Sequence, residues 1–311
     1  MTRGESFLSA PNTAGHWLVS LGHPAPMCKG WSSLRHSLSR WKRPLLACQL
    51  ALILLLLVVL VSRQCARDPA EFQVVMTGEQ RELLLDALGE FHTTLQEAGI
   101  PFFMYGGTLL GSWRHHGLIP WDDDVDVMVS FASRDKLRKT LELLEPRGYT
   151  LNVDQRVRWK LYSSLATPVS GTTWRFPYVD ISFYNLTSNH IVDADPYFAP
   201  VYVFPKDHVF PLTLRPFEGR QLSAPSNTAA VLNATYNLDI CRLKPYSHSE
   251  ERDVRKCSEV PCSEIQQRVP FVSRRRVGGG VCEESLMLNG TVISRVMLMI
   301  DDGCVGSGQR P

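Results

Sequence analysis

One stretch of 25 residues, Tyr105 to Val129, restricts the fold of this chain more than any other part: YGGTLLGSWRHHGLIPWDDDVDVMV. It ends in DVDVMV, where charged and apolar residues alternate. Because successive side chains of a strand point to opposite faces of a sheet, this alternation predicts a half-buried strand. The valines would then face a core, and Asp124 and Asp126 would project together from the other face.

The paired aspartates Asp124 and Asp126 predict a metal site. Two carboxylates a few ångströms apart repel each other unless a cation lies between them, and such a pair suits a hard divalent ion. Asp123 should point away and be structural, while Asp122, in the preceding turn, is expected to be an auxiliary ligand. A solvated acidic turn is the alternative. A calcium loop of the EF-hand kind does not fit, because its alternating ligands and its twelfth-position Glu are absent.

Two glycines, Gly106 and Gly107, lie between a short apolar stretch and an expected short helix. Paired glycines let backbone N–H groups approach a phosphate, and the N-terminus of a helix favours an anion. A simple tight turn is the alternative. Three basic residues further on, Arg114, His115 and His116, are candidates to contact phosphate, although either histidine could equally be a surface residue.

A third acid, Asp180, lies in the apolar run PYVDISFYNL. A charged side chain in such a run needs a partner or a function. A buried structural salt bridge is one explanation. The other is a three-acid site, which suits metal-assisted phosphoryl transfer.

The surrounding region predicts an α+β fold with a mixed α/β sheet. A capping box at Thr77 starts a helix that ends before Gly99, and a second helix is expected to begin at Ser133. Strand-like runs occupy residues 101–107, 124–129, 149–153, 157–165 and 178–184. This mixed order of helices and strands is typical of an α+β body.

An apolar run of about 18 residues, Leu45 to Ser62, precedes this region. A helix rises about 1.5 Å per residue, so the run approaches the thickness of a bilayer and predicts a transmembrane helix, with a buried core helix as the alternative. The long segment before it does not fit a cleaved signal peptide. Basic residues concentrate before the run, which favours a cytoplasmic N-terminus. The expectation is a single-pass type II membrane protein with a signal anchor and a luminal body.

Two features beyond the apolar run agree with a luminal body. Asn185, Asn233 and Asn289 head Asn-X-Ser/Thr triplets and are candidate glycosylation sites. Six of the 8 cysteines also lie beyond the run, where an oxidising compartment would let them pair. Six cysteines allow about 15 pairings, so no pairing is assigned. A net charge of +2 gives no reason to expect a nucleic-acid partner.

The chain is therefore expected to have five parts. They are a disordered cytoplasmic tail (1–44), a transmembrane helix (45–62), a stem (63–76), a catalytic domain (77–240) and a Cys-containing C-terminal segment of unclear fold (241–311). The last segment is predicted to be either a disulfide-tied appendage or poorly ordered.

The motif from Tyr105 to Val127 resembles the LicD family, which includes bacterial phosphocholine transferases and the animal proteins fukutin and fukutin-related protein. The shared pattern is a Gly-Gly-Thr turn, then Arg-His, then Ile-Pro-Trp-Asp-Asp-Asp-aliphatic-Asp. Leu222 to Asp239 resembles the family's closing segment, with Asn237 where a Gly often follows the Tyr. The resemblance covers residues 79–239 and implies a nucleotidyltransferase-type fold.

The resemblance implies a metal-dependent phosphotransferase of the secretory pathway, in the membrane of the Golgi or the endoplasmic reticulum. It would move phosphocholine, ribitol phosphate or a similar phosphorylated alcohol from a CDP-linked donor to a glycan or glycoprotein. Asp124 and Asp126 would hold Mg²⁺ or Mn²⁺, and Asp180 would complete the site and draw the proton from the acceptor hydroxyl. The residues expected to bind substrate are Gly106, Gly107, Thr108, Arg114, His115 and Lys160.

Two other functions remain open from the sequence. A type II Golgi glycosyltransferase could use the D-V-D acids as a nucleotide-sugar metal site, although the Gly-Gly turn and Asp180 argue against it. A non-catalytic glycan-binding or chaperone-like membrane protein is the second. It would show no stabilisation by metal or nucleotide.

Overall fold

The computed structural model describes Leu46 and residues 49–54, 65–299 and 304. The chain divides into two compact units, Met1–Gln64 and Cys65–Pro311. Within the described residues, no helix is both long enough and apolar enough to cross a membrane. The predicted tail (1–44) and most of the predicted membrane span (45–62) lie outside the described residues, so both stay predictions.

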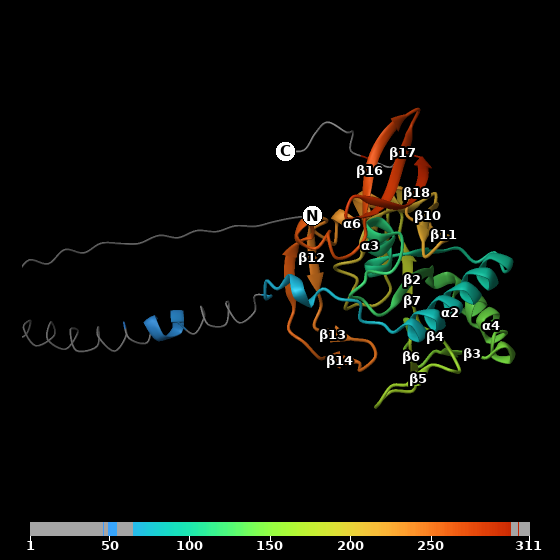
Figure 1. Cartoon of the computed structure of the whole chain (residues 1–311). Helices are drawn as coiled ribbons and strands as arrows, with labels where there is room; N and C mark the ends of the chain where they lie inside the picture. The colour runs from blue at the N-terminus through green and yellow to red at the C-terminus, as the bar shows by residue number, and fades with distance from the viewer. Residues whose placement is uncertain (1–45, 47–48, 55–64, 300–303, 305–311) are drawn as a thin grey trace, which may run out of the picture. The chain divides into compact units, whose positions relative to one another are not determined.

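The second unit is built on a seven-stranded sheet (Figure 1). Five strands follow the order β1–β2–β7–β4–β3, and β8 and β9 extend the sheet from β7. Only β2 and β7 pair in parallel among the described strand pairs of this sheet, so the predicted α+β class with a mixed sheet is confirmed. The strands are β1 Phe102–Met104, β2 Val125–Ser130, β3 Tyr149–Asn152, β4 Arg158–Ser163, β7 Val179–Leu186, β8 His190–Asp193 and β9 Val203–Pro205.

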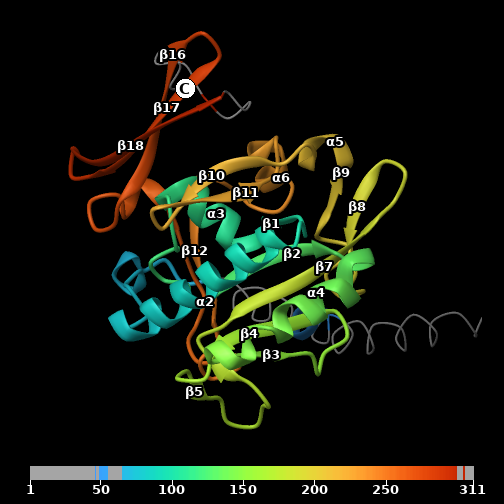
Figure 2. The same cartoon turned by 90° about the vertical axis from the view of Figure 1, so that its right-hand side faces the viewer.

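Two helices, α2 (Gly78–Glu97) and α4 (Arg134–Glu142), cover one face of this sheet (Figure 2). At the start of α2, the Thr77 hydroxyl accepts the backbone N–H of Gln80, and the Gln80 side chain accepts the backbone N–H of Thr77. The predicted capping box is therefore present. Ser133 occupies the N-cap of α4 as expected, but its side chain makes no capping hydrogen bond.

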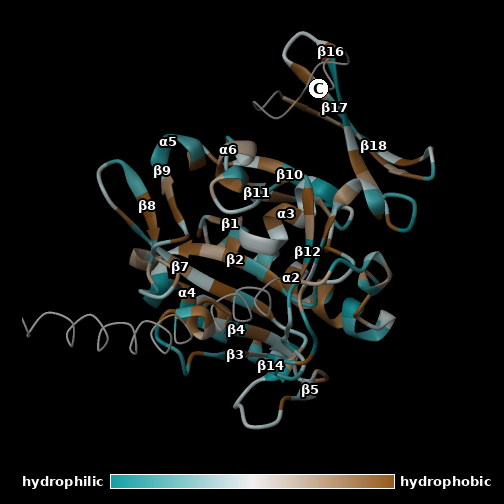
Figure 3. Ribbon diagram, turned by 90° about the vertical axis from the view of Figure 1, so that its left-hand side faces the viewer, coloured by the Kyte–Doolittle hydropathy of each residue, from teal (hydrophilic) through white to brown (hydrophobic). Residues whose placement is uncertain are grey.

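The alternation of residues in the central strands produces the core under these helices. Val127, Ile181 and Trp159 are neighbours across β2, β7 and β4, and all three are buried. The hydrophobic stretches of these strands are brown in Figure 3. One face of the sheet is therefore apolar, and its other face is free to carry polar side chains.

Helix α3 (Gly106–His115) connects β1 to β2, and it begins at the two glycines instead of after them. All of its residues are buried. The shorter elements of the central part are β5 Thr167–Pro168, β6 Arg175–Phe176, α5 Lys206–Val209, β10 Thr213–Phe217, β11 Arg220–Ala224 and α6 Thr228–Asn233. Single turns of 3-10 helix are η1 Pro69–Glu71, η2 Phe131–Ser133, η3 Glu145–Arg147 and η4 Cys262–Glu264.

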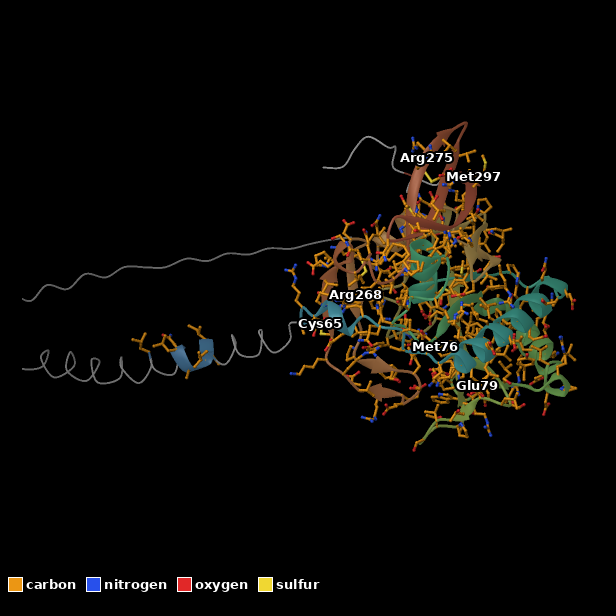
Figure 4. All side chains as sticks on the ribbon, viewed as in Figure 1. Cys65, Met76, Glu79, Arg268, Arg275 and Met297 are labelled. Carbon is orange, nitrogen blue, oxygen red and sulfur yellow. A yellow bond between two sulfur atoms is a disulfide. The ribbon has the colours of Figure 1, made fainter. Side chains whose placement is uncertain are left out.

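The C-terminal segment is tied by disulfides, as one of the two predictions for it proposed. Its elements are β12 Ile240–Leu243, β13 Tyr246–Ser247, β14 Arg252–Asp253, β15 Ser258–Pro261, β16 Phe271–Gly278, β17 Val281–Leu288 and β18 Thr291–Met299. Strands β16, β17 and β18 form a separate sheet, which carries the labelled Arg275 and Met297 in Figure 4. The disulfides are Cys65–Cys257, Cys241–Cys262 and Cys282–Cys304.

Residues 65–76 of the predicted stem pack against this body instead of standing apart from it. Phe72 is buried, with its ring 4.9 Å from that of Trp121. Arg268 donates to the carbonyl of Pro69. The physical reason is apolar burial: Phe72 and Met76 join the hydrophobic core.

Candidate active site

The polar face of the sheet brings three of the predicted site residues into one row. Asp126 of β2 is the register neighbour of Asp180 of β7, and Asp180 is the register neighbour of Lys160 of β4. Lys160 Nζ lies 3.2 Å from Asp180 Oδ2, and both side chains are buried. The Lys160 ammonium also lies 3.7 Å from the centre of the Tyr178 ring. Three strands therefore hold two carboxylates and one cation side by side.

The Gly-Gly-Thr turn closes on this row at the N-terminus of α3. Gly106 has φ +56°, and a Cβ there would lie 3.0 Å from Asp126 Oδ2. A Cβ on Gly107 would lie 2.7 Å from Asp122 Oδ2 and 3.9 Å from Asp126 Oδ2. The Thr108 hydroxyl accepts the backbone N–H of Asp126 at 2.6 Å. Glycine is therefore required here by close approach, and the turn places Asp122 and Asp126 at one helix end.

The acids before β2 form a buried group and not a solvated turn. Asp124 is 8% exposed and Asp123 is 9% exposed. Asp124 lies just before β2 and its Oδ2 is 3.2 Å from His248 Nε2. Asp123 accepts hydrogen bonds from both the ring and the backbone of His248, and its structural role stays a prediction. One ligand atom from each of Asp122, Asp123, Asp124 and His248 lies within 4.8 Å of the others.

Burial and mutual repulsion make the acids hard to ionise. Burial is the main reason that the pKa of Asp126 rises to about 6, and the carboxylate of Asp180 adds to the rise. Burial also raises the pKa of Asp124 well above its ordinary value, while His248 opposes this rise. The charged form of His248 is disfavoured by burial but favoured more strongly by Asp124 and Asp123, which raise its pKa to about 10.

A pocket of about 350 Å³ opens beside these acids and is lined by Gly107 and Asp122. Three cationic side chains of the C-terminal segment, Arg242, Lys244 and Arg255, also line it. Burial would lower the pKa of Lys244, but Asp122, Asp124 and Asp126 raise it instead. Aromatic rings of Trp121, Tyr236 and Tyr246 complete the wall. The pocket thus combines cations with flat apolar surfaces, the chemistry that binds a nucleotide with its phosphates.

The basic residues at the other end of α3 are engaged elsewhere. Arg114 Nη2 donates to the carbonyls of Asn237, Leu238 and Ile240, so this guanidinium holds a loop, although it also borders the pocket. His115 Nδ1 lies 2.7 Å from the Pro270 carbonyl, and burial lowers the pKa of His115 to about 4. A phosphate contact by either residue stays a prediction that these bonds do not favour.

His116 is likewise engaged at the far end of α3. Its Nε2 lies 2.9 Å from Glu284 Oε2, and both side chains are buried. His116 ends α3 with φ 53°. The surface position considered for this histidine is therefore wrong, because the C-terminal sheet covers it.

His248 and Lys244 were not anticipated from the sequence. Both lie beyond residue 240, where the expected catalytic domain ends, in a segment whose sequence shows neither periodicity nor a known motif. The only available signal was the pair Cys241 and Cys262, which bracket them. The predicted domain boundary is not tested directly, but two residues of the candidate site come from beyond it.

The glycosylation triplets are accessible in the structure. Asn185 lies at the end of β7, Asn233 ends α6, and Asn289 lies in the turn between β17 and β18. All three asparagines are exposed. Their modification stays a prediction.

The residues present fit a divalent cation. Asp180 Oδ1 is buried and has no hydrogen-bond partner among the described residues. The glycines leave open the space beside Asp122 and Asp126 that a Cβ would fill. Carboxylate oxygens with one imidazole nitrogen form a donor set for Mg²⁺, Mn²⁺ or a later transition metal.

Comparison with known proteins finds a family model that matches part of the chain. Residues 99–227 match the model of the LicD/FKTN/FKRP nucleotidyltransferase domain, which confirms the resemblance found in the motif. Lipopolysaccharide cholinephosphotransferase LicD of Haemophilus influenzae is 38% identical over 65 residues, covering 21% of this chain and 23% of that protein. Human ribitol 5-phosphate transferase FKRP is 28% identical over 153 residues, covering 43% of this chain and 27% of that protein.

These matches span only parts of the proteins concerned. The chain covers 30% or less of the length of the curated relatives it matches. Among solved structures, the crystal structure of ANT(2")-Ia in complex with adenylyl-2"-tobramycin superposes with a TM-score of 0.33 at 13% identity. That superposition covers 48% of this chain and 72% of the other, and the score is too low to support an assignment.

Proposed function

Because residues 99–227 match the LicD/FKTN/FKRP nucleotidyltransferase domain, we propose that this chain is a metal-dependent transferase acting on phosphorylated alcohols. It would move a group such as phosphocholine or ribitol phosphate from a CDP-linked donor to a glycan hydroxyl. The observation that carries the proposal is the row of Asp126, Asp180 and Lys160 beside the glycine-rich start of α3.

The chain's own residues divide the work of binding the donor. Asp122, Asp124 and Asp126 would hold Mg²⁺ or Mn²⁺, which when bound neutralises charge on the diphosphate leaving group. The first N–H groups of α3, at Gly106 and Gly107, favour a phosphate through the helix dipole. The cations and aromatic rings of the neighbouring pocket bind the remaining phosphate and the base.

Asp180 is the residue that accepts the acceptor's proton in this proposal. Its Oδ2 is bound by Lys160, which leaves the buried Oδ1 available. The acceptor oxygen forms a bond to phosphorus as the bond to the departing CMP oxygen breaks, and the acceptor proton passes to Oδ1. Lys160, 3.2 Å from Oδ2, orients the carboxylate, so it is a positioning residue here.

A donor panel tests the proposal on the purified full chain in detergent. CDP-choline, CDP-ribitol and UDP-sugars are incubated with Mn²⁺ or Mg²⁺ and a glycan acceptor, and release of CMP or UDP is measured. We expect CMP release from a CDP-alcohol that depends on the metal. Asp126→Asn should lower the rate on the order of 10²–10³-fold or more, the usual loss when a group stabilising transition-state charge is removed.

Asp207→Asn, an exposed acid on α5, is the matched control and should retain wild-type activity. Turnover of a UDP-sugar instead would identify a glycosyltransferase. No turnover, together with no thermal stabilisation by metal and nucleotide, would indicate a non-catalytic protein.

We also propose that the body is luminal, with the chain held in a Golgi or endoplasmic reticulum membrane by a single type II span. The disulfides support an oxidising compartment, and the exposed triplets at Asn185, Asn233 and Asn289 support access to glycosylation. Protease protection on intact microsomes, with removal of N-glycans by glycosidase, tests this. Digestion of the body without permeabilisation would refute it.

A further inference from the structure

A loop outside the family-matching residues carries His248 to the acids. The loop begins and ends at β12 and β15, which pair with each other and are joined by the Cys241–Cys262 disulfide. Its distal arm is fixed a second time by the Cys65–Cys257 disulfide. His248 follows β13 directly, so its backbone is held by the β13–β14 pairing.

The ring of His248 is fixed by one carboxylate and directed at another. Asp123 Oδ1 lies 2.6 Å from His248 Nδ1, and Asp123 Oδ2 accepts the His248 backbone N–H at 3.1 Å. The other ring nitrogen, Nε2, lies 3.2 Å from Asp124 Oδ2. The rings of Tyr178 and Tyr246 pack edge-on against the imidazole, at 6.1 and 5.2 Å between centroids. The imidazole therefore has one defined orientation.

This arrangement is the one that proteins use to orient a metal-binding histidine. A ligating imidazole usually donates its second N–H to a carboxylate, which fixes the tautomer and aims the other nitrogen at the ion. Here Asp123 is that carboxylate, and the aimed nitrogen points to Asp124. Ligands of one six-coordinate ion lie up to ~4.2 Å apart, since each bond is ~2.1 Å. One ligand atom from each of Asp122, Asp124 and His248 lies within 4.8 Å of the others, so these atoms need to move only slightly closer together to share one ion.

We propose that His248 is a nitrogen ligand of the cation bound at Asp124, and that Asp123 is its positioning residue and not a ligand. The inference rests on the proposed function in one respect only, because it requires a cation bound at this site. It also predicts which ion is preferred. An imidazole in a carboxylate shell favours Mn²⁺, Co²⁺ or Zn²⁺ over Mg²⁺, because nitrogen is a softer donor than oxygen.

A competing role for the same geometry makes an opposite prediction. If His248 is a permanent cation paired with Asp123 and Asp124, it occupies the place of the metal. Its removal would then strengthen metal binding. If His248 is a ligand, its removal weakens binding, so the sign of the effect separates the two roles.

The experiment uses the full chain, purified in detergent and freed of metal, with Mn²⁺ alone as the probe. Free Mn²⁺ is measured by electron paramagnetic resonance to obtain the affinity, and electron spin echo envelope modulation detects a directly bound ¹⁴N nucleus. We expect ¹⁴N coupling in the wild type. His248→Ala should abolish the coupling and weaken Mn²⁺ binding at least about tenfold, and Asp123→Asn should keep the coupling but weaken binding on the order of 10–100-fold.

His190→Ala, which removes an exposed imidazole on β8, is the matched control and should change neither measurement. His248→Gln keeps a donor for Asp123 and serves if the alanine variant does not fold, as judged by thermal unfolding in chelator. Absence of ¹⁴N coupling in the wild type, absence of Mn²⁺ binding, or unchanged or tighter binding in the His248 variants overturns the inference. If the wild type shows ¹⁴N coupling but no transfer activity with any donor of the panel, only the proposed function is refuted.

Discussion

Helix α3 has a group of buried charges at each end, and the two groups differ in how far their charges are compensated. At its C-terminus, the carboxylate of Glu284 accepts hydrogen bonds from Arg215, Arg274 and His116 at 2.8–2.9 Å. At its N-terminus, Asp126 and Asp122 approach glycines, and neighbouring Asp180 has a buried oxygen without a partner among the described residues.

The acidities of the two groups differ in the same sense. Burial would raise the pKa of Glu284, but His116, Arg215 and Arg274 outweigh it and lower that pKa to about 2. Burial raises the pKa of Asp126 to about 6, and the neighbouring Asp180 adds more to this rise than Lys244 or His248 each takes from it. Glu284 stabilises the fold because its cationic partners outweigh the cost of its burial. Asp124 and Asp126 keep a raised pKa although His248 and Lys244 oppose the rise, so their ionised forms destabilise the fold unless a bound cation or substrate offsets that cost.

The largest expected effect is on the compensated group. Glu284→Gln removes a buried carboxylate that is bonded to Arg215, Arg274 and His116, so the free energy of unfolding should fall by about 3–5 kcal/mol. Glu283→Gln on the same strand, which breaks a pair with the exposed Arg275, should cost less than about 1 kcal/mol. Urea denaturation measures both. Equal effects would mean that the Glu284 group is no more important than a surface pair.

The second prediction is that removing the charge of Asp126 stabilises the fold, and that the size of this effect depends on pH. Because the folded-state pKa of Asp126 is raised, its stabilising contribution is present below its ordinary value and is lost as pH rises through about 6. Asp126→Asn should therefore be neutral near pH 3.5 and should raise the free energy of unfolding by on the order of 2–3 kcal/mol at pH 7 in chelator.

Denaturation of the wild type and the variant at both pH values tests this, with Asp207→Asn, at an exposed position on α5, as the control. If Asp126→Asn is less stable than the wild type at pH 7, the charged form of Asp126 stabilises the fold, as that of Glu284 does.

The smallest expected effect concerns the space between the acids and α3. In Gly107→Ala the added Cβ would lie 2.7 Å from Asp122 Oδ2 and would displace this carboxylate. Mn²⁺ affinity should fall about tenfold, while the free energy of unfolding changes by less than about 1 kcal/mol, since alanine also favours the helix. Gly78→Ala at the start of α2 is the matched control, because no atom lies within 4 Å of its added Cβ. Unchanged Mn²⁺ affinity in Gly107→Ala would show that metal binding does not need the close approach of Asp122 to Gly107.

Much of the central fold follows from local pattern. The capping box at Thr77, the period-two alternation of DVDVMV and the apolar run around Asp180 each place an element to within a few residues. These patterns are readable because they depend on neighbours one to four positions away. Pairing is different: the contact of Asp126 with the Asp180 strand joins positions far apart in the sequence, and no local pattern specifies it.

The basic residues after the glycines show the limit of such reasoning. Arg114, His115 and His116 follow the motif closely, and nearness in sequence suggested nearness to phosphate. A helix of ten residues separates them from the acids, and each meets a segment from beyond residue 236. Conversely, His248 is more than a hundred residues from Asp124 and lies 3.2 Å from it.

The sequence by itself therefore determined the mixed α+β class, the LicD-type motif and the acids that carry a metal-site hypothesis. Only the tertiary structure decided which acids are compensated, which disulfides form and which distant loop completes the site. The physical reason is that periodicity and capping are local properties of the chain. Charge compensation and close approach depend on the packing of segments that only folding brings together.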